Sequence, residues 1–131
     1  GKALELFLEN VALQGGNPEK LMEEVGNRRS SFKKEIFASK DGYIKIDAFK
    51  AGLAGVTLGV GRNRTEDEVC PDAGFILHKK EGDFVKKGEL LMEVYGKDEA
   101  CFTSALPALE KAFSYETAQI SKEKLIFEHI S

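Results

Sequence analysis

The stretch that decides the fold is Gly82-Asp83-Phe84-Val85-Lys86-Lys87-Gly88-Glu89, followed after one residue by Leu91. Gly82 and Gly88 are expected in two tight turns, because glycine adopts positive φ angles without steric cost. We interpret Gly82, Asp83 and Gly88 as structural turn residues. Val85 lies between the two turns and is predicted to fill the core beneath them.

This pattern resembles the turn of barrel-sandwich modules, the family of biotinyl and lipoyl carrier domains. Such a carrier needs one modifiable lysine on an exposed hairpin, flanked by two methionines or by Asp and Ala. Neither arrangement occurs in this chain. We therefore favour a structural turn over a carrier hairpin, and we expect no covalent cofactor on the nearby lysines, which are Lys79, Lys80, Lys86 and Lys87.

Upstream of this stretch, the pattern changes from helical to alternating after Phe32. Apolar residues at helical spacing predict a first helix that ends at Gly15-Gly16, and Asn17-Pro18 predicts the start of a short second helix. Residues 27–31 are polar and mark a boundary. The spacing predicts a helical hairpin over residues 1–26 that packs beside a β-sheet unit.

The later elements alternate between strand and helix signals. We predict strands over 43–47, 74–79 and 90–95, a helix over 48–58 capped by Asp47, and a helix over 105–114 capped by Ser104. The apolar tail 125–130 is expected to dock on the domain. The predicted fold class is α+β: a helical segment over 1–31, then a mixed β-sheet domain of barrel-sandwich or hammerhead type over 32–131, with flanking helices.

Composition excludes several classes of function. The chain has 131 residues and 42% hydrophobic content, which suits one soluble domain. A net charge of -3 argues against nucleic acid or an anionic membrane as the main partner. No apolar run approaches the length of a membrane span. Two cysteines without a CxxC motif favour a reducing cytoplasm, and two histidines, His78 and His129, are too few to suggest a zinc site.

Candidate chemical groups are sparse. The loop 59–64 offers two glycines and two arginines that could hold phosphate, but it matches neither a dinucleotide fingerprint nor a P-loop, so a solvated loop is favoured. The acidic run Glu66-Asp67-Glu68 could bind a metal, although such runs are usually solvated surface. No Ser/His/Asp or Cys/His set has catalytic spacing. The residues alone therefore indicate a domain without an active site.

The whole chain nevertheless resembles the C-terminal third of thymidine and pyrimidine-nucleoside phosphorylases. Four stretches carry the resemblance in the family's order. The first two are Gly1–Glu5 with Ala12–Pro18, which is similar to the family's helix and QGGDP turn, and Ala38–Asp47 with Leu58–Arg62, which is similar to an LGAGR segment. The third is Glu66–Leu91, which follows the family pattern nearly position by position, and the fourth is the closing helix and tail.

The resemblance implies a homodimeric cytoplasmic enzyme that converts a pyrimidine nucleoside and phosphate into base and (deoxy)ribose 1-phosphate. It implies no cofactor, because phosphate is a co-substrate. The family's catalytic and substrate-binding residues precede the matched region, so this chain is expected to contribute none and to need the N-terminal catalytic portion as its partner. Uridine or thymidine preference stays open.

The part of the chain that resembles the family's cleft-closing segment is Gly61, Arg62, Asn63, Arg64, Thr65, Glu66, Asp67 and Glu68. We expect this loop to be the most mobile internal segment of the isolated domain. Arg62 either holds the closed loop or is a buried structural arginine. The alternative function is a free-standing barrel-sandwich binding or interaction module without catalysis.

Overall fold

The structure is a computed structural model that describes residues 1–62 and 64–120. Its helices are α1 (Lys2–Leu13), α2 (Pro18–Glu24), α3 (Ala48–Leu58) and α4 (Phe102–Glu110). Its strands are β1 (Phe32–Phe37), β2 (Gly42–Ile46), β3 (Gly74–Leu77), β4 (Phe84–Val85), β5 (Leu90–Gly96) and β6 (Phe113–Glu116).

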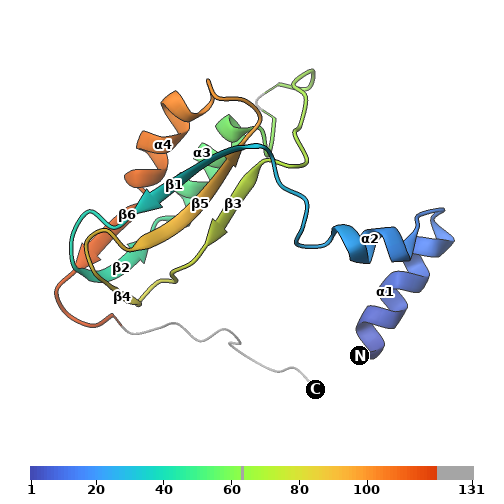
Figure 1. Ribbon diagram of the computed structural model, residues 1–131, viewed down its shortest axis with the longest axis horizontal. Helices are drawn as coiled ribbons and strands as arrows, with labels where there is room; N and C mark the ends of the chain where they lie inside the picture. The colour runs from blue at the N-terminus through green and yellow to red at the C-terminus, as the bar shows by residue number, and fades with distance from the viewer. Residues whose placement is uncertain (63, 121–131) are drawn as a thin grey trace.

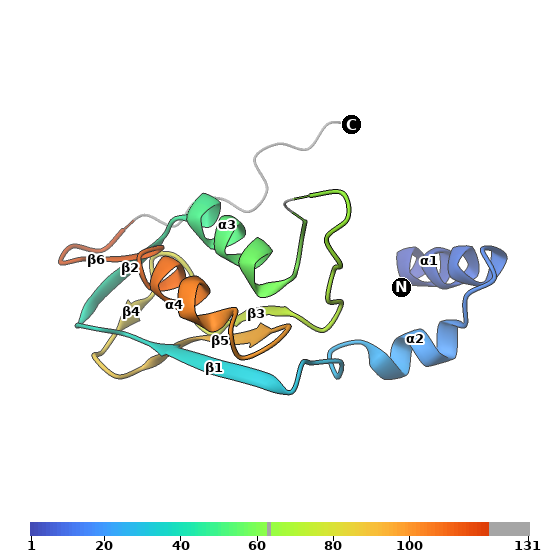
Figure 2. The ribbon, with the colours of Figure 1, turned by 90° about the horizontal axis from the view of Figure 1, so that it is seen from above.

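The described strands form two three-stranded sheets, with the orders β1-β5-β3 and β4-β2-β6. Every strand pair in them is antiparallel. The α+β class is thus confirmed, and the mixed sheet of the prediction takes the form of two antiparallel sheets that do not close into a barrel. Helices α3 and α4 lie side by side over one face of the β1-β5-β3 sheet (Figures 1 and 2).

Strand β5 forms the centre of the core. Leu91 lies on one face of this strand, and Met92 and Val94 lie on the other, since successive side chains alternate. All three side chains are fully buried. Helix α3 contributes small side chains to the core, since its Ala51 and Ala54 are also buried.

The two turns around Val85 share one hydrogen-bond pattern. In the first turn the Asp83 N–H donates to the Lys80 carbonyl at 3.0 Å, and the Lys80 N–H donates to the Asp83 carboxylate at 2.8 Å. In the second turn the Glu89 N–H donates to the Lys86 carbonyl at 3.0 Å, and the Lys86 N–H donates to the Glu89 carboxylate at 3.0 Å. Each acidic side chain therefore closes its own turn.

Glycine is required at the third position of both turns. Gly82 has a φ of 81° and Gly88 a φ of 84°, a region that costs other residues about 1–2 kcal/mol. Their N–H groups also donate to neighbouring backbone, Gly82 to the Ile44 carbonyl at 2.9 Å and Gly88 to the Ala38 carbonyl at 2.8 Å. Val85, between the turns, is fully buried.

Strand β1 was not predicted, and β4 was predicted as part of a turn. The pattern of β1 is obscured because Lys33, Lys34 and Glu35 are consecutive charged residues. The strand is an edge strand that pairs only with β5 among the described strands, and only Ile36 is buried in it. Its formation depends on a partner strand more than 50 residues away in the sequence.

The prediction for the last helix is wrong at both ends. Helix α4 begins at Phe102, and Ser104 lies inside it rather than at its N-cap. Asp98 instead accepts the Cys101 N–H at 2.9 Å. The helix ends at Glu110 because Phe113 pairs with Ile46 in the β2–β6 ladder.

The N-terminal hairpin forms as predicted but does not pack beside the sheets. The Asn17 side chain accepts the Lys20 N–H at 2.9 Å and caps α2. Neither α1 nor α2 has a buried residue, and both helices stand clear of the sheets in the two views (Figures 1 and 2). The following segment is attached, since the Ser30 hydroxyl donates to the Gly96 carbonyl at 2.6 Å.

We predict that the second turn makes folding sensitive to acid. The Lys79 ammonium, helped by the Lys86 N–H, lowers the pKa of the Glu89 carboxylate below its ordinary value of 4.5. As the pH falls, the unfolded chain therefore takes up this proton first, and the free energy of unfolding decreases as the pH falls below about 5. In the Glu89→Gln variant this decrease should be smaller, and stability at pH 7 should be lower.

Urea unfolding at a series of pH values measures this effect. Glu81→Gln, which removes an exposed carboxylate beside the first turn, is the matched control and should keep the acid dependence of the unsubstituted chain. Equal acid dependence in all three proteins would contradict the role of Glu89.

Candidate functional site

The segment between α3 and β3 is held at its base. Gly59 ends α3 in a left-handed conformation, with a φ of 103°. The Cys70 N–H donates to the Gly59 carbonyl at 2.8 Å, and the Lys97 N–H donates to the Leu58 carbonyl at 2.9 Å. The two ends of the loop are therefore joined to each other and to the connection between β5 and α4.

The tip of this loop repeats the hydrogen-bond pattern of the two turns around Val85 but not their backbone conformation, because its third residue is Glu66 and has no positive φ. The Asp67 N–H donates to the Arg64 carbonyl at 3.1 Å, and the Arg64 N–H donates to the Asp67 carboxylate at 2.9 Å. Arg62, Arg64, Thr65, Glu66 and Glu68 are exposed, and Gly61 and Asp67 are half-buried. Asn63 lies outside the described residues.

Arg62 is therefore not the buried structural arginine that the sequence left open. Its side chain is presented on the surface of the loop. An exposed guanidinium at this position can form a new contact with an approaching surface without first leaving a buried partner.

A groove of about 440 Å³ lies under the loop. It is lined by Val56, Thr57, Gly59, Gly61, Asp67, Glu68, Lys97 and Asp98. Three of these residues carry a carboxylate and one carries an ammonium group, so the groove is not suited to phosphate. The Gly59 and Val60 N–H groups donate to α3 carbonyls and are also committed. The geometry thus favours the solvated loop over the phosphate cradle.

Sequence reasoning did not find Lys97 and Asp98. These residues follow β5, and only the chain fold brings them beside the loop after α3. One local signal was available for Asp98, because an acidic residue three positions before Cys101 can accept its N–H and start a helix. Lys97 had no such signal.

No described cluster of three or more His, Cys, Asp or Glu residues could hold a metal ion. The acidic run 66–68 is part of the loop surface and rim. His78 Nε2 lies 3.3 Å from the Glu93 carboxylate on the sheet surface, and His129 lies outside the described residues. Cys101 is buried and Cys70 is half-buried, both with free thiols.

A charged group covers the outer face of the β1-β5-β3 sheet. Glu35 and Glu93 are directly opposite each other in the β1–β5 register, and like charges in such a pair repel. The Lys33 ammonium ion-pairs with both carboxylates. Lys33, with a contribution from His78, lowers the pKa of Glu93, and the two carboxylates raise the pKa of Lys33. The ammonium group between the two carboxylates offsets their repulsion, so the group is best explained as structural.

The N-terminal hairpin carries an exposed apolar surface. Leu4 and Phe7 of α1 are 44% and 54% exposed, and Met22 and Val25 at α2 are 45% and 60% exposed. These side chains are the apolar stripes that the helical spacing predicted. They lie on elements without a buried residue, so the described part of the chain does not supply the partner that amphipathic helices require.

Comparison with known proteins identifies the fold family. The family model described as the pyrimidine nucleoside phosphorylase C-terminal domain matches residues 43–116, more than half of the chain. The chain belongs to this family. The match begins in β2 and ends with β6, so it covers both helices of the helix layer, the loop after α3 and the two turns around Val85.

Curated relatives agree with the family model. The chain is 37% identical over 95 residues to a thymidine phosphorylase of Metamycoplasma hominis, covering 72% of this chain and 35% of the relative. It is 36% identical over 100 residues to a pyrimidine-nucleoside phosphorylase of Geobacillus stearothermophilus, covering 76% of this chain and 23% of the relative. An AMP phosphorylase of Methanococcus maripaludis is 32% identical over 132 residues, covering 100% of this chain and 23% of the relative.

The chain therefore spans about a quarter to a third of the length of these relatives. No helix in the described part of the chain combines the length and the apolar character needed to cross a membrane.

Proposed function

We propose that this chain is the C-terminal part of a pyrimidine-nucleoside phosphorylase. The parent enzyme converts a pyrimidine nucleoside and phosphate into the free base and ribose or deoxyribose 1-phosphate. In this role residues 1–31 end the large domain of the parent and residues 32–131 form its C-terminal domain. Family membership and the names of the thymidine and pyrimidine-nucleoside phosphorylases among the relatives support this proposal.

The observation that carries the proposal is the exposed apolar surface of α1 and α2. A helix of 12 residues is marginal in water by itself and depends on packing of its apolar face. Leu4 and Phe7 of α1 are exposed and are not part of the core that the described residues form. A preceding catalytic portion would cover this surface and make the hairpin part of its own domain.

In this proposal the catalytic portion carries out the reaction, and this chain supplies no reacting group. Phosphorolysis breaks the glycosidic C–N bond and joins a phosphate oxygen to the same sugar carbon, which calls for cationic groups around phosphate. The groove under the loop is instead rich in carboxylates. Phosphate and nucleoside would bind on the catalytic portion, and the parent would act as a homodimer in the cytoplasm without a further cofactor.

The loop 61–68 would close over the cleft of the parent enzyme. Its base is joined by the hydrogen bond between Cys70 and Gly59, while its tip presents the exposed side chains of Arg62 and Arg64. A loop that is fixed at the base and exposed at the tip can contact an opposing lobe without rearrangement of the core. Arg62 would form this contact through a carboxylate or backbone carbonyls.

A second candidate substrate class rests on one observation. One relative that aligns with the whole chain is an AMP phosphorylase, whose name specifies a nucleotide rather than a nucleoside. The alternative of a free-standing binding module has no comparable support, because it leaves the apolar surface of α1 and α2 uncovered.

We predict that the 131-residue chain alone catalyses no phosphorolysis. Incubation with phosphate and thymidine, uridine or AMP should release no free base above the buffer blank, as followed by chromatography. Coding sequence immediately upstream of Gly1 should contain an in-frame catalytic portion, and the longer protein should turn over one of these substrates.

Two results would contradict this proposal. Release of base by the isolated chain that is lost on substitution within it would place catalysis here. An upstream region without a catalytic portion would instead support the free-standing module.

We predict that Arg62→Ala in the full-length enzyme lowers kcat or raises KM while the melting temperature stays unchanged. The physical reason is that an exposed arginine acts in closure and not in the stability of the core. Arg29→Ala, which removes an exposed arginine outside the loop, is the control and should leave the kinetics unchanged. A sharp fall in melting temperature with normal kinetics at low temperature would show that Arg62 is structural.

A further inference from the structure

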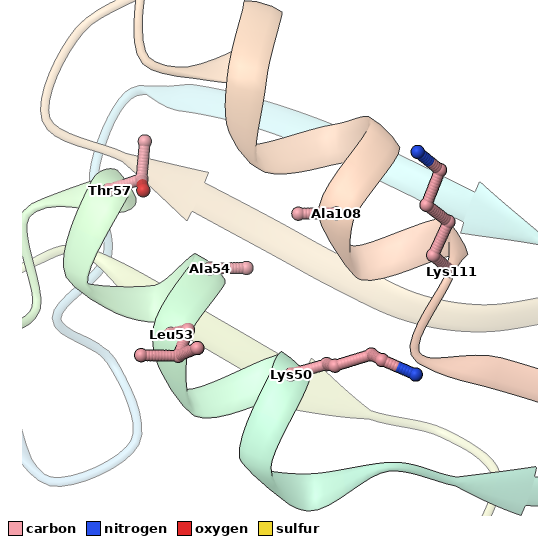
Figure 3. Close-up of a pocket in the computed structure, with 6 residues that line it drawn as sticks. All are labelled: Lys50, Leu53, Ala54, Thr57, Ala108 and Lys111. Carbon is pink, nitrogen blue, oxygen red and sulfur yellow. The ribbon is translucent and has the colours of Figure 1, made fainter.

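A groove of about 300 Å³ runs between α3 and α4 (Figure 3). It is lined by Lys50, Leu53, Ala54, Thr57, Ala108 and Lys111. Lys50 and Lys111 stand at one end of the groove, and Thr57 stands at the other end (Figure 3). The groove is therefore apolar along its length and cationic at one end.

The groove exists because two facing residues are small. Ala54 of α3 and Ala108 of α4 leave a hollow between the helices that larger side chains would have filled. Leu53 borders the hollow and is 56% exposed, and nearby Phe49 is 75% exposed. Apolar surface of this kind favours a large apolar side chain as its occupant.

One segment of this chain has the matching chemistry. Residues 125–130 read Leu-Ile-Phe-Glu-His-Ile, with four large apolar residues and one carboxylate, that of Glu128. They lie outside the described residues. The sequence predicted that this tail docks on the domain.

The connection is long enough for the tail to reach the groove. Strand β6 ends at Glu116 and runs beside β2, and Lys111 at the cationic end of the groove lies only two residues before that strand begins. The eight residues 117–124 can span at most roughly 26–29 Å. Returning along the length of β6 takes about 10 Å, so the segment can turn back without strain.

We propose that residues 125–130 of the same chain occupy the groove between α3 and α4. Large apolar side chains cover Ala54 and Ala108, and the Glu128 carboxylate lies near the ammonium groups of Lys50 and Lys111. The cationic end also holds Asp47, whose carboxylate is 2.9 Å from the Lys50 ammonium, so the two ammonium groups still outnumber the carboxylate.

The chain has no tryptophan, which makes a single reporter possible. In a Phe127→Trp variant of the 131-residue chain, docking predicts blue-shifted emission and slow quenching by acrylamide relative to the same protein unfolded in urea. Adding Leu53→Asp should move both readings to the unfolded values. Adding Leu13→Asp, a matched substitution on the 80% exposed side chain of α1, should change neither.

A second measurement avoids any effect of the new tryptophan. In the unsubstituted chain a carbodiimide should join Glu128 to Lys111 or Lys50, and Lys111→Gln should remove the first of these cross-links from the peptide mass spectrum. Far-ultraviolet circular dichroism should confirm that every variant keeps the fold.

Three results would overturn the proposal. The first is a solvent-like tryptophan together with no cross-link to Glu128. The second is shielding that is unchanged by Leu53→Asp. The third is shielding or cross-linking that disappears on dilution, which would assign the groove to the tail of a second copy.

Discussion

The burial of both faces of β5 is the constraint on which the rest of this structure depends. Leu91 is fully buried on one face, and Met92 and Val94 are fully buried on the other. A strand buried on both faces needs a partner along each edge and a cover over each face. Strands β1 and β3 supply the edges, and the helix layer of α3 and α4 covers one face. On the other face Leu91 is buried, and Glu93 forms the charged group with Lys33 and Glu35.

The turns show how local chemistry supports this arrangement. Three turns, at 64–67, 80–83 and 86–89, use the same pair of hydrogen bonds, in which an acidic residue at the fourth position accepts the N–H of the first. Two of them flank the buried Val85, since the turn 80–83 leads into β4 and the turn 86–89 leads into β5. The third is at the tip of the exposed loop after α3, where the same hydrogen bonds form without a positive φ at the third residue. The same side-chain hydrogen bond therefore closes turns both in the fold and in the proposed site.

Elements whose start and apolar pattern are marked by residues close in the sequence could be predicted from sequence. Helix α3 is the clearest case, because Asp47 caps its start as predicted and its predicted bounds, 48–58, are those of the structure. Strand β1 could not be found in this way, since three consecutive charged residues hide its alternation and its only described partner strand lies far along the chain. The ends of α4 are likewise set by Asp98 and by the pairing of Phe113 with Ile46.

The candidate site was predicted only in part for the same reason. The loop was visible in sequence because its residues are contiguous. The groove beneath it was not, because Lys97 and Asp98 come from a different connection and join the loop only through the fold. The proposed function came from the resemblance to a family, whereas residue chemistry alone indicated a domain without an active site.

The central claim is that residues 32–120 form a self-sufficient core while α1 and α2 depend on a partner that precedes them in the parent enzyme. Amide hydrogen exchange on the 131-residue chain tests this claim most directly. The account predicts that β5 amides exchange only through global unfolding, and that α1 amides exchange near the rate of an unstructured peptide. Protection of α1 equal to that of β5 would contradict it, because the hairpin would then be packed within this chain.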